Sequence, residues 1–211
     1  MKVLLHPGYF PNIANFAVMV QQDICWEVED NYQKQTYRNR SYVCTDSGKH
    51  LLSIPIKHIG FNIHGKQKYK DVKIENEYNW QRQHWRTLQT AYRTSPFFEY
   101  YEDDLAPLFK KHHTFLLDFN MKTIQCIHEC LQIKMPTGKT ETYVPSPKHI
   151  KDGRFLVNAK NNLEFVQEEY TQVFNDRHPF IKNVSILDLL FNEGPNAVTY
   201  LKNINLDFLN D

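Results

Sequence analysis

The stretch from Asn79 to Glu102, NWQRQHWRTLQTAYRTSPFFEYYE, constrains the fold most strongly, because it carries the clearest helical periodicity in the chain. At about 100° per residue, apolar and small side chains form one stripe while arginines occupy the opposite side. The stripe consists of Trp80, His84, Thr87, Leu88, Ala91 and Ser95, and the opposite side carries Arg82, Arg86 and Arg93. Asn79 is a typical N-cap residue and Pro96 disfavours the α conformation at Ser95, so we expect a helix between these two ends. A histidine within an apolar stripe is unusual, and His84 has to be explained.

The composition indicates a globular protein, and we expect a single domain over residues 1–211. Hydrophobic residues make up 41% of the chain, enough to bury a core, and a net charge of +1 provides no field that would attract nucleic acid. The 4 cysteines include no C-x-x-C pair, which predicts reduced thiols and a cytoplasmic protein. The N-terminal apolar run is too short for a signal peptide, and no run is long enough to span a membrane.

Strand-like patterns concentrate in the first third of the chain, and helical patterns in the remainder. The predicted strands are Lys2–Leu5, Ile24–Asp30, Tyr37–Thr45, Leu51–Ile56 and Asp71–Ile74, with the third and fourth paired as a hairpin across the turn at residues 46–48. Residues 61–69 are predicted to be an exposed loop. This distribution favours an α/β or α+β fold, in which a small N-terminal sheet with a hairpin is covered by helices that dominate the C-terminal two thirds.

Further helices are expected at residues 15–22, 108–112, 115–133 and 165–175, with Pro107 starting or kinking the second of these. The segment 134–153 holds three prolines and two glycines and is predicted to be an irregular connector. Near the C-terminus, Ser185 is expected to cap a short apolar helix that Gly194 ends, and Pro195 opens the next helix. We interpret the polar residues of this last block, including Asp188, as structural.

His6 is the first candidate for chemistry, because it follows the first predicted strand in the sequence HPGYFP. Ligands of open α/β sheets bind at the carboxyl ends of the strands. A histidine at that place can act as a general base, contact a phosphate or bind a metal. Alternatively, the two prolines shape a turn that His6 merely fills.

A second candidate site contains Asp30, Arg38 and Arg40. Residues two apart on a strand share a face, so the two guanidinium groups would repel each other unless an anion or carboxylates lie between them. Asp30 and Glu29 could be that partner structurally, whereas a phosphate, pyrophosphate or carboxylate ligand is the functional alternative. We favour the anion site, because planar bidentate donors suit such groups. Asn39 would lie on the other strand face.

His84 is the third candidate, and the simplest interpretation is a buried histidine with satisfied hydrogen bonds. The neighbouring Trp85 and arginines favour a functional role, since an apolar surface that excludes water shifts the pKa of a titratable group beside it. If His84 and His6 converge, they can form a general acid–base pair. The histidine and cysteine spacings predict no metal site, because Cys126 and Cys130 share a helix face that excludes His128. The sequence identifies no cofactor and no activated nucleophile.

Five sequence blocks that span most of the chain resemble the WbqC-like protein family of bacteria. Their residue content is similar to that of members from the Bacteroidetes. These blocks are HPGYFP at 6–11, VEDNYQKQTYRNR at 28–40, WQRQHW at 80–85, AYRTSPFFEYYED at 91–103 and SILDLLFNEGPNA at 185–197. The family is named after a protein of O-antigen gene clusters. The resemblance therefore implies a role in surface-polysaccharide biosynthesis and specifies no reaction.

Two hypotheses follow. In the first, the protein is a transferase that moves a group or an acyl unit from an anionic activated donor such as a sugar nucleotide. Its expected site comprises His6 and His84 for proton transfer, Asp30 for orientation, Arg38, Asn39 and Arg40 for the anion, and Tyr9 and Trp85 as pocket walls. In the second, the protein is a non-catalytic scaffold that holds a glycan or a partner through the same cleft or through an exposed aromatic cluster at Phe97–Tyr101. The first predicts convergence in one pocket, and the second predicts an exposed apolar patch.

Overall fold

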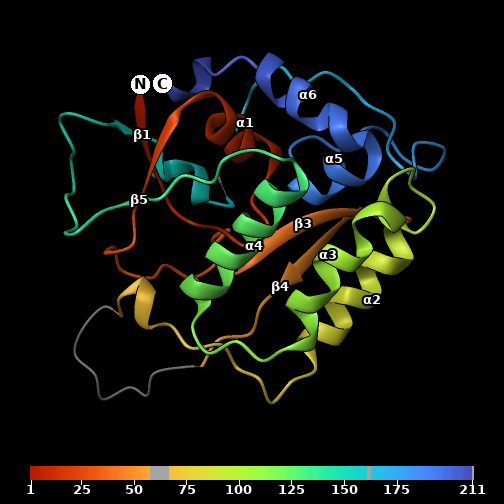
Figure 1. Ribbon diagram of the computed structural model, residues 1–211, viewed down its shortest axis with the longest axis horizontal. Helices are drawn as coiled ribbons and strands as arrows, with labels where there is room; N and C mark the ends of the chain where they lie inside the picture. Colours follow the sequence, from red (N-terminus) through yellow and green to blue (C-terminus); the bar gives the residue numbers. More distant parts are fainter. Residues whose placement is uncertain (58–66, 161–162, 211) are drawn as a thin grey trace.

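The computed structural model describes residues 1–57, 67–160 and 163–210, and shows a mixed α/β fold (Figure 1). The fold class is therefore as predicted. Most of the predicted exposed loop at residues 61–69 lies outside the described residues. Its last residue, Tyr69, is fully buried and begins a short 3₁₀ helix, η1 (Tyr69–Asp71). The predicted strand Asp71–Ile74 is wrong, because only isolated bridges form there, from Lys73 to Phe115 and from Ile74 to Ile56.

A four-stranded parallel sheet forms in the order β5-β2-β1-β6. The strands are β1 (Lys2–Leu5), β2 (Asp23–Trp26), β5 (Gly138–Lys139) and β6 (Lys151–Asp152). Helix α1 (Ile13–Gln21) connects β1 to β2, and the side chain of Asn12 caps it by accepting from the backbone N–H of Asn15. The connector predicted at 134–153 thus supplies two strands of this sheet, and its description as irregular is only partly right.

Strand β2 ends at Trp26, four residues earlier than predicted. The backbone N–H of Glu27 still donates to the Leu5 carbonyl oxygen at 2.7 Å, but the Glu27 carboxylate then accepts from the N–H of Glu29 at 2.9 Å. A side chain that bonds its own following backbone competes with sheet pairing. The chain consequently turns away from the sheet just where acidic residues follow one another.

The hairpin is present as predicted, with shifted ends. It pairs β3 (Arg40–Thr45) with β4 (Gly48–Ser53) in antiparallel register, from Arg40 opposite Ser53 to Thr45 opposite Gly48. Gly48 adopts a φ of +93°, which favours glycine in the tight turn.

The long helical stretch forms α2 (Trp80–Tyr92), followed by α3 (Phe98–Lys110) and α4 (Leu116–Cys130), which pack against one another in sequence (Figure 1). The stripe of α2 faces the protein and its arginines are exposed, as predicted, although Asn79 makes no side-chain cap. Helix α3 contains Pro107 rather than starting there. Helix α3 is therefore longer than the helix predicted at residues 108–112.

Helix α5 (Ile186–Glu193) is capped by the Ser185 hydroxyl and ended by Gly194, and α6 (Ala197–Asn203) follows a short 3₁₀ turn, η3 (Gly194–Asn196), as predicted. The other 3₁₀ helices are η2 (Arg154–Val157) and η4 (Asp207–Leu209). The helix predicted at residues 165–175 is wrong, because the chain there is extended and then makes turns.

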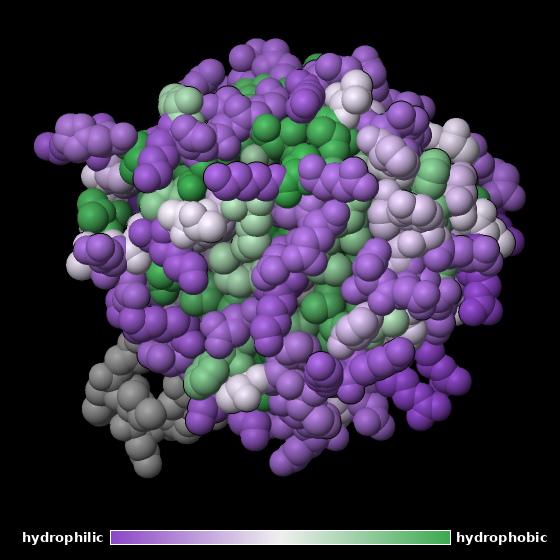
Figure 2. All heavy atoms as spheres, viewed as in Figure 1, coloured by the Kyte–Doolittle hydropathy of each residue, from purple (hydrophilic) through white to green (hydrophobic). Residues whose placement is uncertain are grey.

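The core lies between the sheet, the hairpin and the helices, and its largest buried side chains include Trp26, Tyr9 and Phe119. Figure 2 shows a face on which polar side chains predominate and apolar ones appear in patches between them. Within the described part of the chain, no helix combines the length and apolar character needed to cross a membrane.

Candidate functional site

Charged and polar residues follow the parallel strands at the same edge of the sheet. His6 comes directly after β1, Glu27 directly after β2, Thr140 directly after β5 and Arg154 two residues after β6. In chain order, the strands run outward from β1 through β2 to β5, and the chain then returns to place β6 on the other side of β1. This reversal is a topological switch point, the usual ligand site of open α/β sheets.

His6 bonds with two charged residues from the segment that follows β2. Its Nε2 lies 2.9 Å from the Nη2 of Arg38 and 3.2 Å from the Oδ2 of Asp30, and the same Arg38 nitrogen donates to Asp30 at 3.0 Å. All three residues are buried, and Arg38 is 0% exposed. The structure therefore brings together three of the predicted site residues, although they lie up to 32 positions apart in the sequence.

Burial lowers the pKa of His6 to about 4, because it outweighs the hydrogen bond to Asp30, which raises the pKa, and the charge of Arg38 adds to the lowering. His6 is therefore neutral at pH 7 and has one ring nitrogen free to accept a proton. Nδ1 has no hydrogen-bond partner among the described residues. Nε2 accepts from Arg38 if it carries the lone pair, since a guanidinium only donates, whereas it donates to Asp30 if it carries the hydrogen. In the second of these tautomers, Nδ1 is the basic nitrogen.

Burial tends to raise the pKa of the Asp30 carboxyl, but the hydrogen bonds from His6 and the Asn31 backbone and the charge of Arg38 together lower it below its ordinary value. Asp30 is thus ionised and compensates the buried guanidinium of Arg38. Further contacts hold Arg38 in place: its guanidinium lies 5.3 Å from the centroid of the Tyr69 ring, and its carbonyl oxygen accepts from Asn120 at 2.6 Å.

A second charged group lies on the other side of the switch point. Glu27 is 0% exposed; one carboxylate oxygen accepts from the Thr140 hydroxyl at 2.9 Å, and the other lies 3.5 Å from Nη1 of Arg154. Arg154 is itself held by Asp152, which accepts from Nε at 2.9 Å and from Nη2 at 2.6 Å. The charge of Arg154 also lowers the pKa of His6, which indicates that the two groups of residues are neighbours.

Gly153 allows this arrangement because it lies directly against β1. A Cβ atom there would lie 2.8 Å from Cδ2 of Leu5 and 3.2 Å from the carbonyl oxygen of Leu4. The backbone N–H of Gly153 donates to that same carbonyl at 3.0 Å. This close approach brings the following Arg154 to Glu27.

The remaining predicted residues lie apart from these contacts. The hydroxyl of Tyr9 hydrogen-bonds Nδ1 of His84 at 2.9 Å, and both side chains are buried. Burial lowers the pKa of His84 to about 4, against the opposing effect of a hydrogen bond with the Ser53 backbone. His6 and His84 thus have different bonding partners, and Tyr9 packs in the core instead of lining an open pocket.

The prediction that Arg38 and Arg40 share a strand face is wrong, because β3 begins at Arg40 and Arg38 belongs to the preceding turn. Arg40 is half-buried, and its Nε has no hydrogen-bond partner among the described residues. Asn39 donates to the carbonyl oxygen of Ile54 at 3.0 Å and so extends the hairpin pairing. Trp85 packs on the Phe109 ring, with centroids 5.2 Å apart.

Sequence reasoning missed Glu27, Asp152 and Arg154 as members of the cluster. Glu27 stood inside the predicted strand Ile24–Asp30, and the other two stood in a segment that carried no strand pattern. The signal that could have found them is position, since each lies at or just after the end of a parallel strand.

Asp188 is the centre of a separate buried network, consistent with the structural role expected for its block. Its carboxylate accepts from the hydroxyls of Tyr92 at 2.7 Å and Tyr170 at 2.5 Å, and from Gln172 at 2.9 Å. Burial raises the pKa of this carboxyl in spite of these hydrogen bonds. The nearby Cys44 is a free thiol whose pKa burial raises to about 12, so it is not an activated nucleophile.

Together, the fold and the site define an α/β protein whose short parallel sheet ends in a cluster of one histidine, two arginines and three carboxylates, of which all but Asp152 are buried. Comparison with known proteins agrees with this description and makes it more specific. The chain belongs to the WbqC-like protein family, whose model matches residues 6–157 and 145–200. It is also 29% identical over 224 residues to a protein of Mycobacterium tuberculosis (strain ATCC 25618 / H37Rv) described as uncharacterized protein Rv1507c, with 92% of each chain covered. No solved structure matches the chain significantly.

Proposed function

We propose that this protein is a cytoplasmic group-transfer or acyl-transfer enzyme of bacterial surface-polysaccharide biosynthesis, acting as one domain on an anionic activated donor such as a sugar nucleotide. Membership of the WbqC-like family suggests a protein related to polysaccharide biosynthesis. The observation that carries the catalytic part of the proposal is the contact of His6 with Asp30 and Arg38 at the carboxyl edge of the sheet.

His6 is the proton acceptor in this proposal. The proposal requires the tautomer in which Nε2 donates its hydrogen to Asp30 and the Nη2 hydrogens of Arg38 point to the carboxylate, so that Nδ1 carries the lone pair. Nδ1 then removes a proton from the hydroxyl or amine of the acceptor as that group attacks the donor. Arg38 bonds the same carboxylate oxygen, which orients Asp30 and prevents it from taking up the proton itself.

The anion-binding role falls to Arg40 rather than to the pair of arginines. The guanidinium of Arg38 is already engaged by Asp30 and by the Thr36 hydroxyl, whereas Arg40 makes no ion pair among the described residues. His84 is assigned to packing, because its hydrogen bonds go to Tyr9 and to the Ser53 backbone. Trp85 and Asn39 likewise support the surrounding structure.

The scaffold alternative receives less support from the aromatic cluster. Of its rings, Phe98 and Tyr101 are 0% and 2% exposed and Phe97 is half-buried, so only Tyr100, at 70%, lies on the surface. A single exposed ring does not make the apolar patch that a docking surface needs.

The test compares His6→Gln and Asp30→Asn with the matched control His112→Gln, which changes an exposed histidine. Purified proteins are incubated with sugar nucleotides and acyl thioesters plus amino-sugar acceptors, and products are measured by mass spectrometry. We expect His6→Gln to lower turnover by about 10²- to 10⁴-fold, the usual contribution of a general base. In cells that lack the gene, His6→Gln should fail to restore the surface glycan, whereas His112→Gln restores it. Full restoration by His6→Gln would contradict the enzyme proposal and favour the scaffold.

A further inference from the structure

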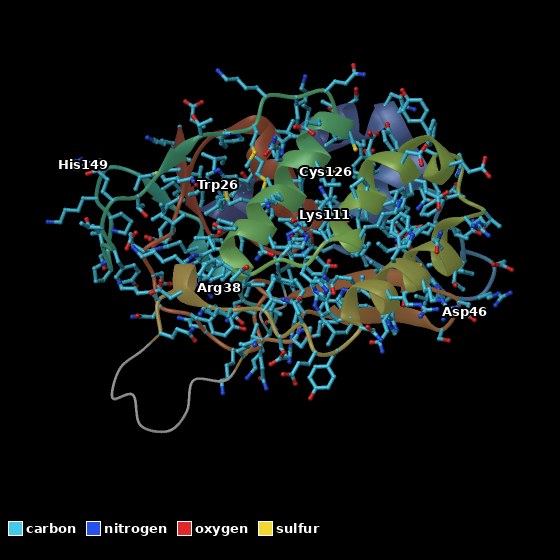
Figure 3. The ribbon with its side chains drawn as sticks, turned by 60° about the horizontal axis from the view of Figure 1, so that its bottom comes forward. Trp26, Arg38, Asp46, Lys111, Cys126 and His149 are labelled. Atoms are coloured by element: carbon cyan, nitrogen blue, oxygen red, sulfur yellow. The ribbon has the colours of Figure 1, made fainter. Side chains whose placement is uncertain are left out.

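The exposed side of α2 forms one wall of a cavity that lies far from His6. The cavity has a volume of about 520 Å³, and its walls come from α2, from the tip of the β3–β4 hairpin and from the turn around Phe174. Figure 3 shows Asp46, at the hairpin tip, near the right edge of the molecule and well apart from Arg38, which lies left of centre. A volume of this size is typical of small-molecule sites.

Cationic groups line this cavity without being neutralised. Arg86 of α2 is exposed and has no ion-pair partner among the described residues. Arg177 lies 3.7 Å from Asp46, but the two side chains are 56% and 60% exposed, so solvent screens this pair. A ligand with a negative charge would therefore gain two guanidinium partners and displace little protein–protein interaction.

Hydroxyl groups supply the second kind of contact. Thr45 and Thr87 each donate to a backbone carbonyl, at 3.0 Å in both cases, which leaves their oxygen lone pairs available as acceptors. Thr90 also lines the cavity. Several hydroxyl acceptors beside guanidinium donors match a ligand that has many hydroxyl groups together with an anionic group.

The floor of the cavity is apolar. Ala91 is 2% exposed, and the ring of Phe174 lies beneath the guanidinium of Arg177, 5.6 Å from its carbon to the ring centroid. An apolar surface next to hydroxyl acceptors suits the C–H faces of a sugar ring. A neighbouring cavity shares Arg86 and Thr90 and adds Arg93, so the cationic lining continues along α2.

We infer that this cavity binds a saccharide unit that carries a phosphate or a carboxylate. Arg86 and Arg177 bind the anionic group, and the sugar ring lies on Ala91 and Phe174 with its hydroxyls donating to the threonines. The inference goes beyond the proposed function, because it adds a ligand that the proposed chemistry at His6 does not require. It places that ligand at a site separate from the His6 cluster, so each can fail without the other.

The experiment uses the full chain and four probes: glucose 1-phosphate, glucuronate, glucose and inorganic phosphate. Binding is measured by calorimetry and located by ¹H–¹⁵N NMR. At least one acidic sugar should bind more tightly than glucose or phosphate and shift the amide signals of Thr45–Ser47 and Thr87–Ala91. Arg86→Ala and Arg177→Ala should each weaken this binding about tenfold, as expected for a lost charged hydrogen bond.

Arg82→Ala is the matched control, because Arg82 is exposed on the same helix but does not line the cavity. It should leave the affinity unchanged, and so should His6→Gln. The inference is overturned if neither acidic sugar binds at about 10 mM, if phosphate binds as well as the acidic sugars, or if Arg82→Ala weakens binding as much as Arg86→Ala. Loss of turnover in His6→Gln with intact sugar binding supports both sites separately. Circular dichroism melts confirm that the surface variants are folded.

Discussion

His6→Gln should make the stability of this protein less sensitive to mild acid. The pKa of His6 is about 4 in the folded protein, against an ordinary value of 6.5. Between these two pH values, the unfolded chain binds a proton that the folded protein does not, so the free energy of unfolding falls as the pH falls. The stabilisation by neutral His6 is complete above pH 6.5 and is lost as the pH approaches 4.

The size of this effect follows from the width of the window. A window of about 2.5 pH units, at about 1.4 kcal/mol per unit, gives between about 3 and 4 kcal/mol for this one imidazole. Burial also lowers the pKa values of His84, His113 and His128, so they add acid sensitivity of the same sign. Asp188, whose pKa burial raises, acts in the opposite direction. His6→Gln therefore removes one share of the pH dependence rather than all of it.

The assay is urea unfolding followed by circular dichroism at several pH values between about 7 and 4.5, a range that lies above the titration of Asp30. Glutamine is the suitable replacement, because its amide nitrogen can take the place of Nε2 beside Asp30. Wild type should lose about 2 to 3 kcal/mol more than His6→Gln across this range, whereas the exposed variant His112→Gln should match wild type. Equal losses in wild type and His6→Gln would refute the assignment of a neutral, desolvated His6.

Three other predictions concern the same structure. Tyr92→Phe should lower the free energy of unfolding in urea by about 1–3 kcal/mol, because it removes a buried hydrogen-bond donor to Asp188. Gly194→Ala should lower the melting temperature more than Gly48→Ala; both glycines have positive φ, but a Cβ at Gly194 would lie 2.6 Å from a phenyl ring while Gly48 faces open space. Arg38→Met should destabilise the protein by about 3 kcal/mol or more in the same assay, since it leaves the buried Asp30 carboxylate without its cationic partner, and equal stability would contradict the geometry described.

Local signals predicted those elements whose causes are local. Helix α5 was predicted correctly because a serine cap, an apolar run and a glycine that ends the helix all lie within about ten residues of the sequence. The amphipathic stripe of α2 was also predictable from its period. By contrast, β5 and β6 contain two residues each, too few to show any alternation, and they exist only because β1 and β2 offer them partners.

The mistaken helix at residues 165–175 has a tertiary cause. Tyr170 and Gln172 point their polar groups at Asp188, and the Gln172 side chain also accepts from the backbone N–H of Ile181. These long-range hydrogen bonds fix an extended and turning chain where a helical period alone would have suggested otherwise.

The candidate site was predictable in part for the same reasons. The position of His6 after a strand was visible, and Asp30 was foreseen as a structural partner for an arginine. The sequence could not show that the turn before β3 buries Arg38 completely and leaves Arg40 half-buried, because both have the same residue type and similar neighbours. It also could not place Arg154 beside Glu27, since that contact spans 127 positions.

The contact between Arg154 and Glu27 in the charged cluster depends on the small size of Gly153, which carries no charge itself. A methyl group at this position would lie within 3 Å of side-chain atoms of Leu5 and Val3, so either these side chains or the backbone of Gly153 must shift. A shift of the backbone would also move the guanidinium of Arg154 that faces Glu27. Glu27 would then be an uncompensated anion in a dry interior, which it could relieve only by taking up a proton or by admitting water. A steric change at Gly153 would thus have an electrostatic effect at Glu27. A chain with a larger residue at position 153 would also need an uncharged residue at position 27.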